Sequence, residues 1–188
     1  MTFQTTLEGW HTFYSIAGTS AAALVGLLFV GLALHLREVV THPDVRSLAR
    51  VTLTSFAITL VLSLFMVEPG ENPSSTGADI LVMGAFGLAL IVPNLVTGLR
   101  SREHTIGFWR MLLRFGVTCL ACVGLMLTGG LFLSGDVKSG LDQLVPITIA
   151  LLVVSVRNTW DVLVSVGAAT LARAERQKSE PPSHTGNA

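Results

Sequence analysis

Long apolar runs separated by short polar connections dominate this chain. Five runs are long enough to cross a bilayer: residues 13–34, 48–67, 80–99, 115–133 and 146–172. A helix of about 20 apolar residues crosses the hydrocarbon core, and in lipid the backbone must satisfy its own hydrogen bonds. The pattern therefore predicts an all-α fold, an integral membrane bundle of five transmembrane helices forming one domain, residues 1–172. Residues 173–188 are expected to form a disordered cytoplasmic tail.

The composition agrees with this prediction. The 188 residues are 51% hydrophobic and 13% charged, whereas a soluble domain carries about a quarter charged residues. Twelve basic residues balance twelve acidic ones, which excludes a nucleic-acid partner. No connection between the predicted spans is long enough to bury a core of its own, so we expect no soluble catalytic or ligand-binding domain.

Basic residues gather on one side of the predicted bundle. That side carries ten of the twelve Lys and Arg residues: Arg37, Arg46, Arg50, Arg100, Arg102, Arg110, Arg114, Arg173, Arg176 and Lys178. The opposite side carries Lys138 and a set of acidic residues: Glu8, Glu68, Glu71, Asp79, Asp136 and Asp142. Because basic connections remain in the cytoplasm, the sequence predicts an N-terminus outside the cell and a cytoplasmic C-terminus.

The first span is expected to be retained as a membrane helix. No Lys or Arg precedes it, and its apolar run is too long for the core of a signal peptide. Trp10, Phe13 and Tyr14 stand at its outer end, where they fit the aromatic belt that lines a membrane interface.

The last span carries a polar cluster: Arg157, Asn158, Trp160 and Asp161. If this helix begins at Pro146, a favourable first-turn residue, Arg157 lies about 17 Å along it, near the midplane of a core about 30 Å thick. Asp161 follows one turn later and can pair with Arg157. Because charge in lipid is costly, the face bearing Arg157 and Asp161 is expected to point into the protein.

Three interpretations of this cluster are open. The cluster could line a route for an ion, a proton or a small solute. It could instead hold the bundle together through an Arg157–Asp161 pair, completed by hydroxyl groups of neighbouring helices: Thr19, Ser20, Thr59 or Ser63. In the third interpretation the span ends near Val156, and residues 162–172 lie along the inner membrane interface.

Two further features concern helix packing. Gly18, Ala22 and Gly26 recur at four-residue spacing, which permits close approach of a second helix and predicts a packing seam, within the chain or between copies. Pro93 and Asn94 mark a candidate helix kink, because proline frees a backbone carbonyl that the amide of Asn94 could satisfy.

The sequence predicts no catalytic, cofactor-binding or metal site, and therefore a protein that is not an enzyme. Cys119 and Cys122 form a CxxC inside an apolar helix and are expected to be small buried hydrophobes. Neither a paired set of deep carboxylates nor a nucleophile with a base at the same depth is present in the sequence pattern. A glycine-rich phosphate-binding loop is missing as well.

Two segments carry a resemblance. Residues 13–30 open with Phe-Tyr and contain the run Ala-Gly-Thr-Ser-Ala-Ala-Ala-Leu-Val-Gly from Ala17 to Gly26, and residues 157–163 read Arg-Asn-Thr-Trp-Asp-Val-Leu. Together they resemble small bacterial multi-spanning integral membrane proteins of unknown function. The resemblance implies the bacterial cytoplasmic (inner) membrane, and it implies no activity, ligand or site.

The leading functional hypothesis is a non-enzymatic structural or regulatory membrane subunit. Such a subunit would pack with itself as a homo-oligomer or with a larger membrane complex, and the lipid bilayer is its expected partner. The alternative is an oligomeric channel or transporter for an ion or small solute that uses the polar face of the last helix.

Overall fold

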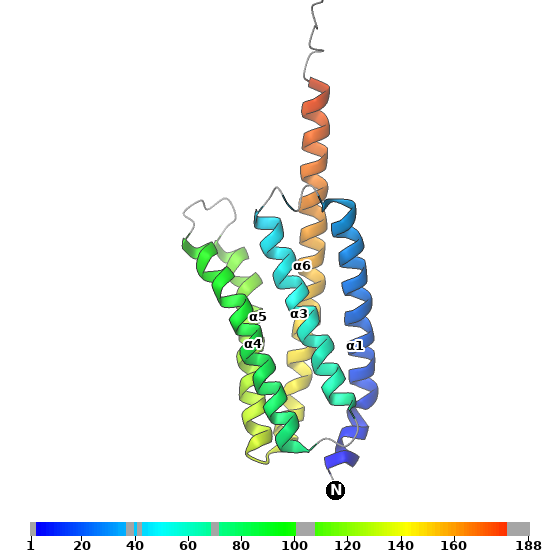
Figure 1. Cartoon of the computed structure of the whole chain (residues 1–188), viewed down its shortest axis with the longest axis vertical. Helices are drawn as coiled ribbons and strands as arrows, with labels where there is room; N and C mark the ends of the chain where they lie inside the picture. The colour runs from blue at the N-terminus through cyan, green and yellow to red at the C-terminus, as the bar shows by residue number, and fades with distance from the viewer. Residues whose placement is uncertain (1–2, 37–39, 41–42, 69–71, 101–107, 180–188) are drawn as a thin grey trace, which may run out of the picture.

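The computed structural model describes residues 3–36, 40, 43–68, 72–100 and 108–179, some of them by their backbone alone. Five long helices contain almost all of them: α1 (Phe3–Leu34), α3 (Pro43–Val67), α4 (Pro73–Arg100), α5 (Phe108–Leu133) and α6 (Val137–Ser179) (Figure 1). Within the described ranges no residue lies in a β-strand. The predicted all-α fold is confirmed.

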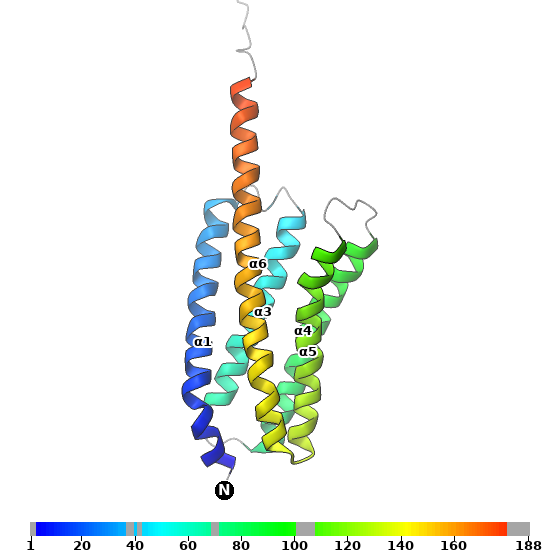
Figure 2. The same ribbon diagram turned by 180° about the vertical axis from the view of Figure 1, so that it is seen from behind.

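The helices run alternately up and down, so the two ends of the bundle differ. At the projecting end, α1 and α4 finish, α3 and α5 begin, and α6 extends beyond the other helices (Figures 1 and 2). The N-terminus and the α5–α6 turn lie at the opposite end. α3 is central, in contact with α1, α4 and α6, while α4 and α5 form a close pair.

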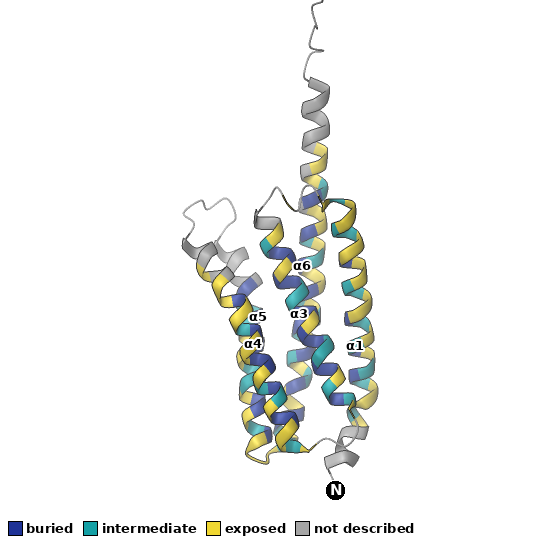
Figure 3. Cartoon of the chain, in the orientation of Figure 1, coloured by how far each residue is buried: buried dark blue, intermediate teal, exposed yellow. Residues whose placement is uncertain are grey.

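All five helices are long and apolar enough to cross a membrane. The candidate spans are Gly9–Leu34, Arg46–Val67, Pro73–Pro93, Phe115–Leu133 and Val137–Ala168. Their outer sides expose large apolar residues such as Leu27 and Leu120, 66% and 70% exposed (Figure 3). An apolar exterior of this extent is typical of a surface that meets lipid.

The helix α6 begins at Val137, which makes the predicted start at Pro146 wrong. After α5 ends at Leu133, Gly135 has φ 88° and the Asp136 amide donates to the Leu131 carbonyl at 3.0 Å, as in a Schellman C-cap. Asp136 then caps the next helix, because its Oδ1 accepts the Ser139 amide at 3.3 Å. Since this turn starts α6 at once, Pro146 lies inside the helix.

The far end of α6 also differs from the prediction. The helix continues without interruption to Ser179, past the predicted boundary at Ala172, and projects along its own axis (Figures 1 and 2). The interpretation in which the span ends near Val156 and the next segment lies along the interface is therefore wrong. Residues 180–188 of the predicted tail, together with Arg37, Glu71 and Arg102, lie outside the described residues.

Candidate functional site

One face of α6 points into the bundle and is mixed apolar and polar. Its buried residues recur at intervals of three and four: Leu144, Thr148, Leu151, Ser155, Asn158, Val162 and Val166. Val162 and Val166 form a cluster with Leu48 of α3, and Leu152 packs against the cluster that contains Phe56. Because α3 and α6 are antiparallel, these contacts place Asn158 level with Thr52 and Ser155 level with Ser55.

α3 presents a matching column of buried hydroxyl groups: Thr52, Ser55, Thr59 and Ser63. Each donates its hydrogen to the carbonyl four residues earlier in α3, at 2.8 to 3.0 Å. Ser55 Oγ also lies 3.4 Å from Thr118 Oγ1 of α5. A hydroxyl that donates to its own helix keeps its oxygen lone pairs as acceptors, so this column offers acceptors to the bundle interior.

Two buried polar atoms of α6, Ser155 Oγ and Asn158 Nδ2, have no hydrogen-bond partner among the described residues. Tyr14 is fully buried and lies beside Thr148, so its expected place in an interfacial aromatic belt is wrong. Asn158 is 2% exposed and Ser155 is 0% exposed. An unpaired buried polar group costs about 1–3 kcal/mol, so Ser155 Oγ and Asn158 Nδ2 lower the stability of the bundle.

The predicted polar cluster of α6 is divided between two surfaces. Asn158 alone is fully buried, whereas Arg157 is exposed, Trp160 is 68% exposed and Asp161 is half-buried. The expectation that Arg157 points into the protein is therefore wrong. The reason is helical geometry, since residues 157 and 158 are separated by about 100° around the axis and cannot share the narrow internal face.

The earlier start of α6 changes the position of Arg157 along the helix. It follows Val137 by about 30 Å of helix. Val162 lies about 8 Å further along α6. It is level with Leu48, and therefore with the turn of α3 from Arg46 to Arg50. Arg157 therefore lies inside the candidate span Val137–Ala168, and its position near the midplane of the membrane stays a prediction.

The predicted seam on α1 is also divided. Gly18 faces α3, because an added Cβ would lie 2.8 Å from Ser63 Cβ. Ala22 and Gly26 are exposed, because each lies about 40° further around the helix from the contact with α3, and a Cβ at Gly26 would meet no described heavy atom within 4 Å. The internal contact therefore involves Gly18 alone of the three residues, with Ala17 and Ala21 buried beside it.

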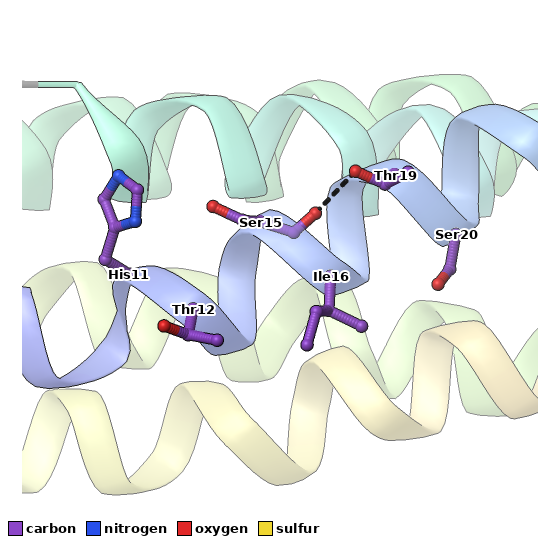
Figure 4. A pocket seen from close by; sticks show the side chains of 6 residues that line it. All are labelled: His11, Thr12, Ser15, Ile16, Thr19 and Ser20. Carbon is purple, nitrogen blue, oxygen red and sulfur yellow. Dashed lines mark hydrogen bonds between the residues drawn. The ribbon is translucent and has the colours of Figure 1, made fainter.

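A hollow lies on the outer side of α1, lined by His11, Thr12, Ser15, Ile16, Thr19 and Ser20 (Figure 4). Thr19 donates a hydrogen bond to the Ser15 carbonyl at 2.8 Å. Ser15, Thr19, Ala22 and Gly26 follow one another along this side of α1 at spacings of four, three and four residues. We call these four residues the outer α1 stripe. Thr19 and Ser20 line this outer hollow, so their expected role in completing an Arg157–Asp161 pair is wrong.

The sequence analysis did not identify the closest helix contact, which lies between α4 and α5. An added Cβ at Gly84 would lie 2.8 Å from the Cys122 carbonyl oxygen, and one at Gly87 would lie 2.8 Å from Cys122 Sγ. Cys122 is thus a small buried packing residue, as expected.

α4 continues through Pro93 to Arg100, and the side chain of Asn94 lies outside the described residues, so the kink at this pair stays a prediction.

The internal column could have been found from spacing, because hydroxyl residues recur at 52, 55, 59 and 63 on one helical face. Asn158 was identified, whereas Ser155, Thr148 and Tyr14 were missed. In the described part of the chain, no group of three or more His, Cys, Asp or Glu side chains could hold a metal ion. Comparison with protein-family models, curated proteins and solved structures gave no match.

Proposed function

We propose that this protein is a non-enzymatic membrane subunit that assembles with a second copy of itself through the outer side of α1. It would reside in a bacterial inner membrane, with its N-terminus outside and the projecting end of α6 in the cytoplasm. The excess of Arg and Lys positions at the projecting end supports this orientation.

The observation that carries the proposal is the outer α1 stripe together with the hollow beside it. Lipid-facing surfaces are normally apolar, yet this one bears hydroxyl groups and small residues, Ser15, Thr19, Ala22 and Gly26. In a membrane, small residues let backbones approach closely and hydroxyls form bonds between helices. α1 is also the least buried candidate span, at 17%, so most of its surface is available to a partner.

Disulfide cross-linking tests this assembly. The native Cys119 and Cys122 are replaced by Ala, and a single cysteine is introduced by Ala22→Cys. Oxidation in native membranes is expected to produce a covalent dimer. The matched control is Val82→Cys, 64% exposed on α4, which should stay monomeric. A monomer in both variants rejects self-assembly through α1.

Labelling with a membrane-impermeant thiol reagent tests the orientation in the same cysteine-free background. Ser134→Cys at the α5–α6 turn is expected to react in intact cells, and Ser179→Cys only after permeabilisation. The reverse pattern would contradict the proposed topology. It would not bear on self-assembly, which the cross-linking experiment tests separately.

A second candidate function is transport of a small solute through the bundle interior. Its specific support is the pair of unpartnered polar atoms on the inner face of α6, Ser155 Oγ and Asn158 Nδ2. The residue to test is Asn158, because Arg157 lies on the outer surface. Flux into proteoliposomes that is lost in Asn158→Leu and kept in Arg157→Leu would support transport, and no flux of cations, anions or protons would weaken it.

A further inference from the structure

The side of α6 that faces away from the bundle places a charged residue in an apolar surface. Arg157 is exposed on this side. Its neighbours on the same side are exposed as well: Ile149 at 47%, Val153 at 61% and Trp160 at 68%. Figure 2 shows α6 in front of α3, so this side lies on the outside of the bundle. In a membrane such a surface meets lipid, where a charged side chain is costly unless an anion pairs with it.

The chain itself supplies at most part of this anion. Asp161 lies one turn beyond Arg157 and is half-buried. A guanidinium carries five N–H donors, and a carboxylate in bidentate geometry accepts two of them, so the others stay available to a second anion. Trp160 follows Arg157 by three residues, a spacing that brings side chains together on a helix, and its indole carries a further N–H donor.

We infer that Arg157 and Trp160 bind the phosphate of an anionic phospholipid on the outer side of α6. The guanidinium donates to the phosphate oxygens, whose geometry it matches. The indole N–H of Trp160 donates to the phosphate or to an ester carbonyl of the same lipid. Val153 and Ile149, one and two turns before Arg157, pack against the acyl chain.

The phosphate belongs to the leaflet at the projecting end. Arg46 and Arg50 of α3 are exposed on either side of Leu48. Leu48 forms a cluster with Val162 of α6, and Arg157 precedes Val162 by about 8 Å along the helix. A long side chain that extends toward the projecting end brings its charge close to the level of these arginines. Basic residues at one level of the bundle favour an anionic headgroup over a zwitterionic one.

Quenching of tryptophan fluorescence by brominated lipids tests this site. The chain contains three Trp residues, so Trp10→Phe and Trp109→Phe leave Trp160 as the sole reporter. Vesicles contain phosphatidylcholine and phosphatidylglycerol, and one of the two lipids is brominated in each measurement. The quenching is expected to show phosphatidylglycerol enriched about fivefold beside Trp160, the factor that one basic residue provides at an anionic surface. Equal quenching by the two lipids overturns the inference.

Variants of the arginines show whether Arg157 is the source of the preference. Arg157→Leu is expected to remove it, and the matched control Arg50→Leu should keep it, since Arg50 lies on α3. Loss of the preference in both variants would indicate general attraction to the basic end. Loss in both, or in neither, overturns the site. Arg157→Gln provides the same comparison if Arg157→Leu does not fold.

The position of the bromine atoms along the acyl chain gives the depth of Trp160 in the same preparations. Bromine near the headgroups is expected to quench more strongly than bromine near the chain ends. The reverse order would place Trp160 near the midplane of the membrane, out of reach of a phosphate, and would overturn the inference. None of these measurements depends on self-assembly through α1.

Discussion

A Cβ added at Gly129 of α5 would lie 2.7 Å from the backbone carbonyl oxygen of Gly77 in α4. A Cβ at Gly77 would in turn lie 3.0 Å from the Gly129 carbonyl oxygen. The two helices therefore meet backbone to backbone at this point, an approach that any larger residue would prevent. This contact explains why α4 and α5 form a close pair while the other helices pack through side chains.

Gly129→Ala is expected to destabilise the bundle. The new methyl group would meet backbone atoms, which cannot rotate away, so we expect a loss of about 1–3 kcal/mol in the free energy of unfolding. The neighbouring Gly130 is the matched control, because a Cβ there meets no atom of the described chain within 4 Å. Gly130→Ala should stabilise α5 by about 0.5–1 kcal/mol. Unfolding of both variants in mixed micelles measures the difference, and equal stabilities would contradict the backbone contact.

Gly18→Ala and Gly26→Ala are expected to have different effects on stability, because the two glycines lie on different sides of α1. At Gly18 the new Cβ would lie 2.8 Å from Ser63 Cβ, so the α1–α3 contact must open at a cost of about 1–3 kcal/mol. At Gly26 the space is open within the monomer, and its stability should not fall. If the outer α1 stripe binds a second copy, Gly26→Ala lowers dimer formation in the cross-linking assay. A loss of monomer stability in Gly26→Ala would instead place this face inside the bundle.

Arg157→Leu is expected to leave the fold intact. An exposed side chain contributes about 0–1 kcal/mol through ion pairs, and removal of the charge eases insertion of α6 by roughly 3 kcal/mol. A double-mutant cycle with Asp161→Leu should give a coupling energy of at most about 1 kcal/mol. Unfolding of the two single variants and the double variant measures it. If the Arg157→Leu variant alone failed to fold, that result would support the structural Arg157–Asp161 ion pair that the sequence suggested.

Asp136→Ala is expected to weaken the start of α6. The substitution removes the acceptor of the Ser139 amide, and loss of an N-cap of this kind costs about 1 kcal/mol. Asp142→Ala is the control, since Asp142 is an exposed acidic residue further along the same helix. Hydrogen exchange at the first amides of α6 should accelerate in Asp136→Ala and stay unchanged in Asp142→Ala. Equal exchange would show that the turn is held by Gly135 and packing alone.

The sequence itself determined the number of helices that could span a membrane and their approximate positions. Apolar length is a local property, so each span could be recognised without knowledge of its neighbours. The sequence also contains a local signal for the start of α6, in Gly135 and Asp136, although Pro146 suggested a later start. A cap specifies where a helix begins more directly than a proline that a helix can tolerate in its interior.

Only the tertiary structure decided which side of each helix faces inward. In a soluble protein, the alternation of apolar and polar residues marks the buried face, but lipid is as apolar as the protein interior and removes that signal. Gly18 and Gly26 therefore look equivalent in the sequence, and so do Arg157 and Asn158. Packing against α3 separates them: Gly18 lies against Ser63 and Asn158 is buried, whereas Gly26 and Arg157 stay at the surface.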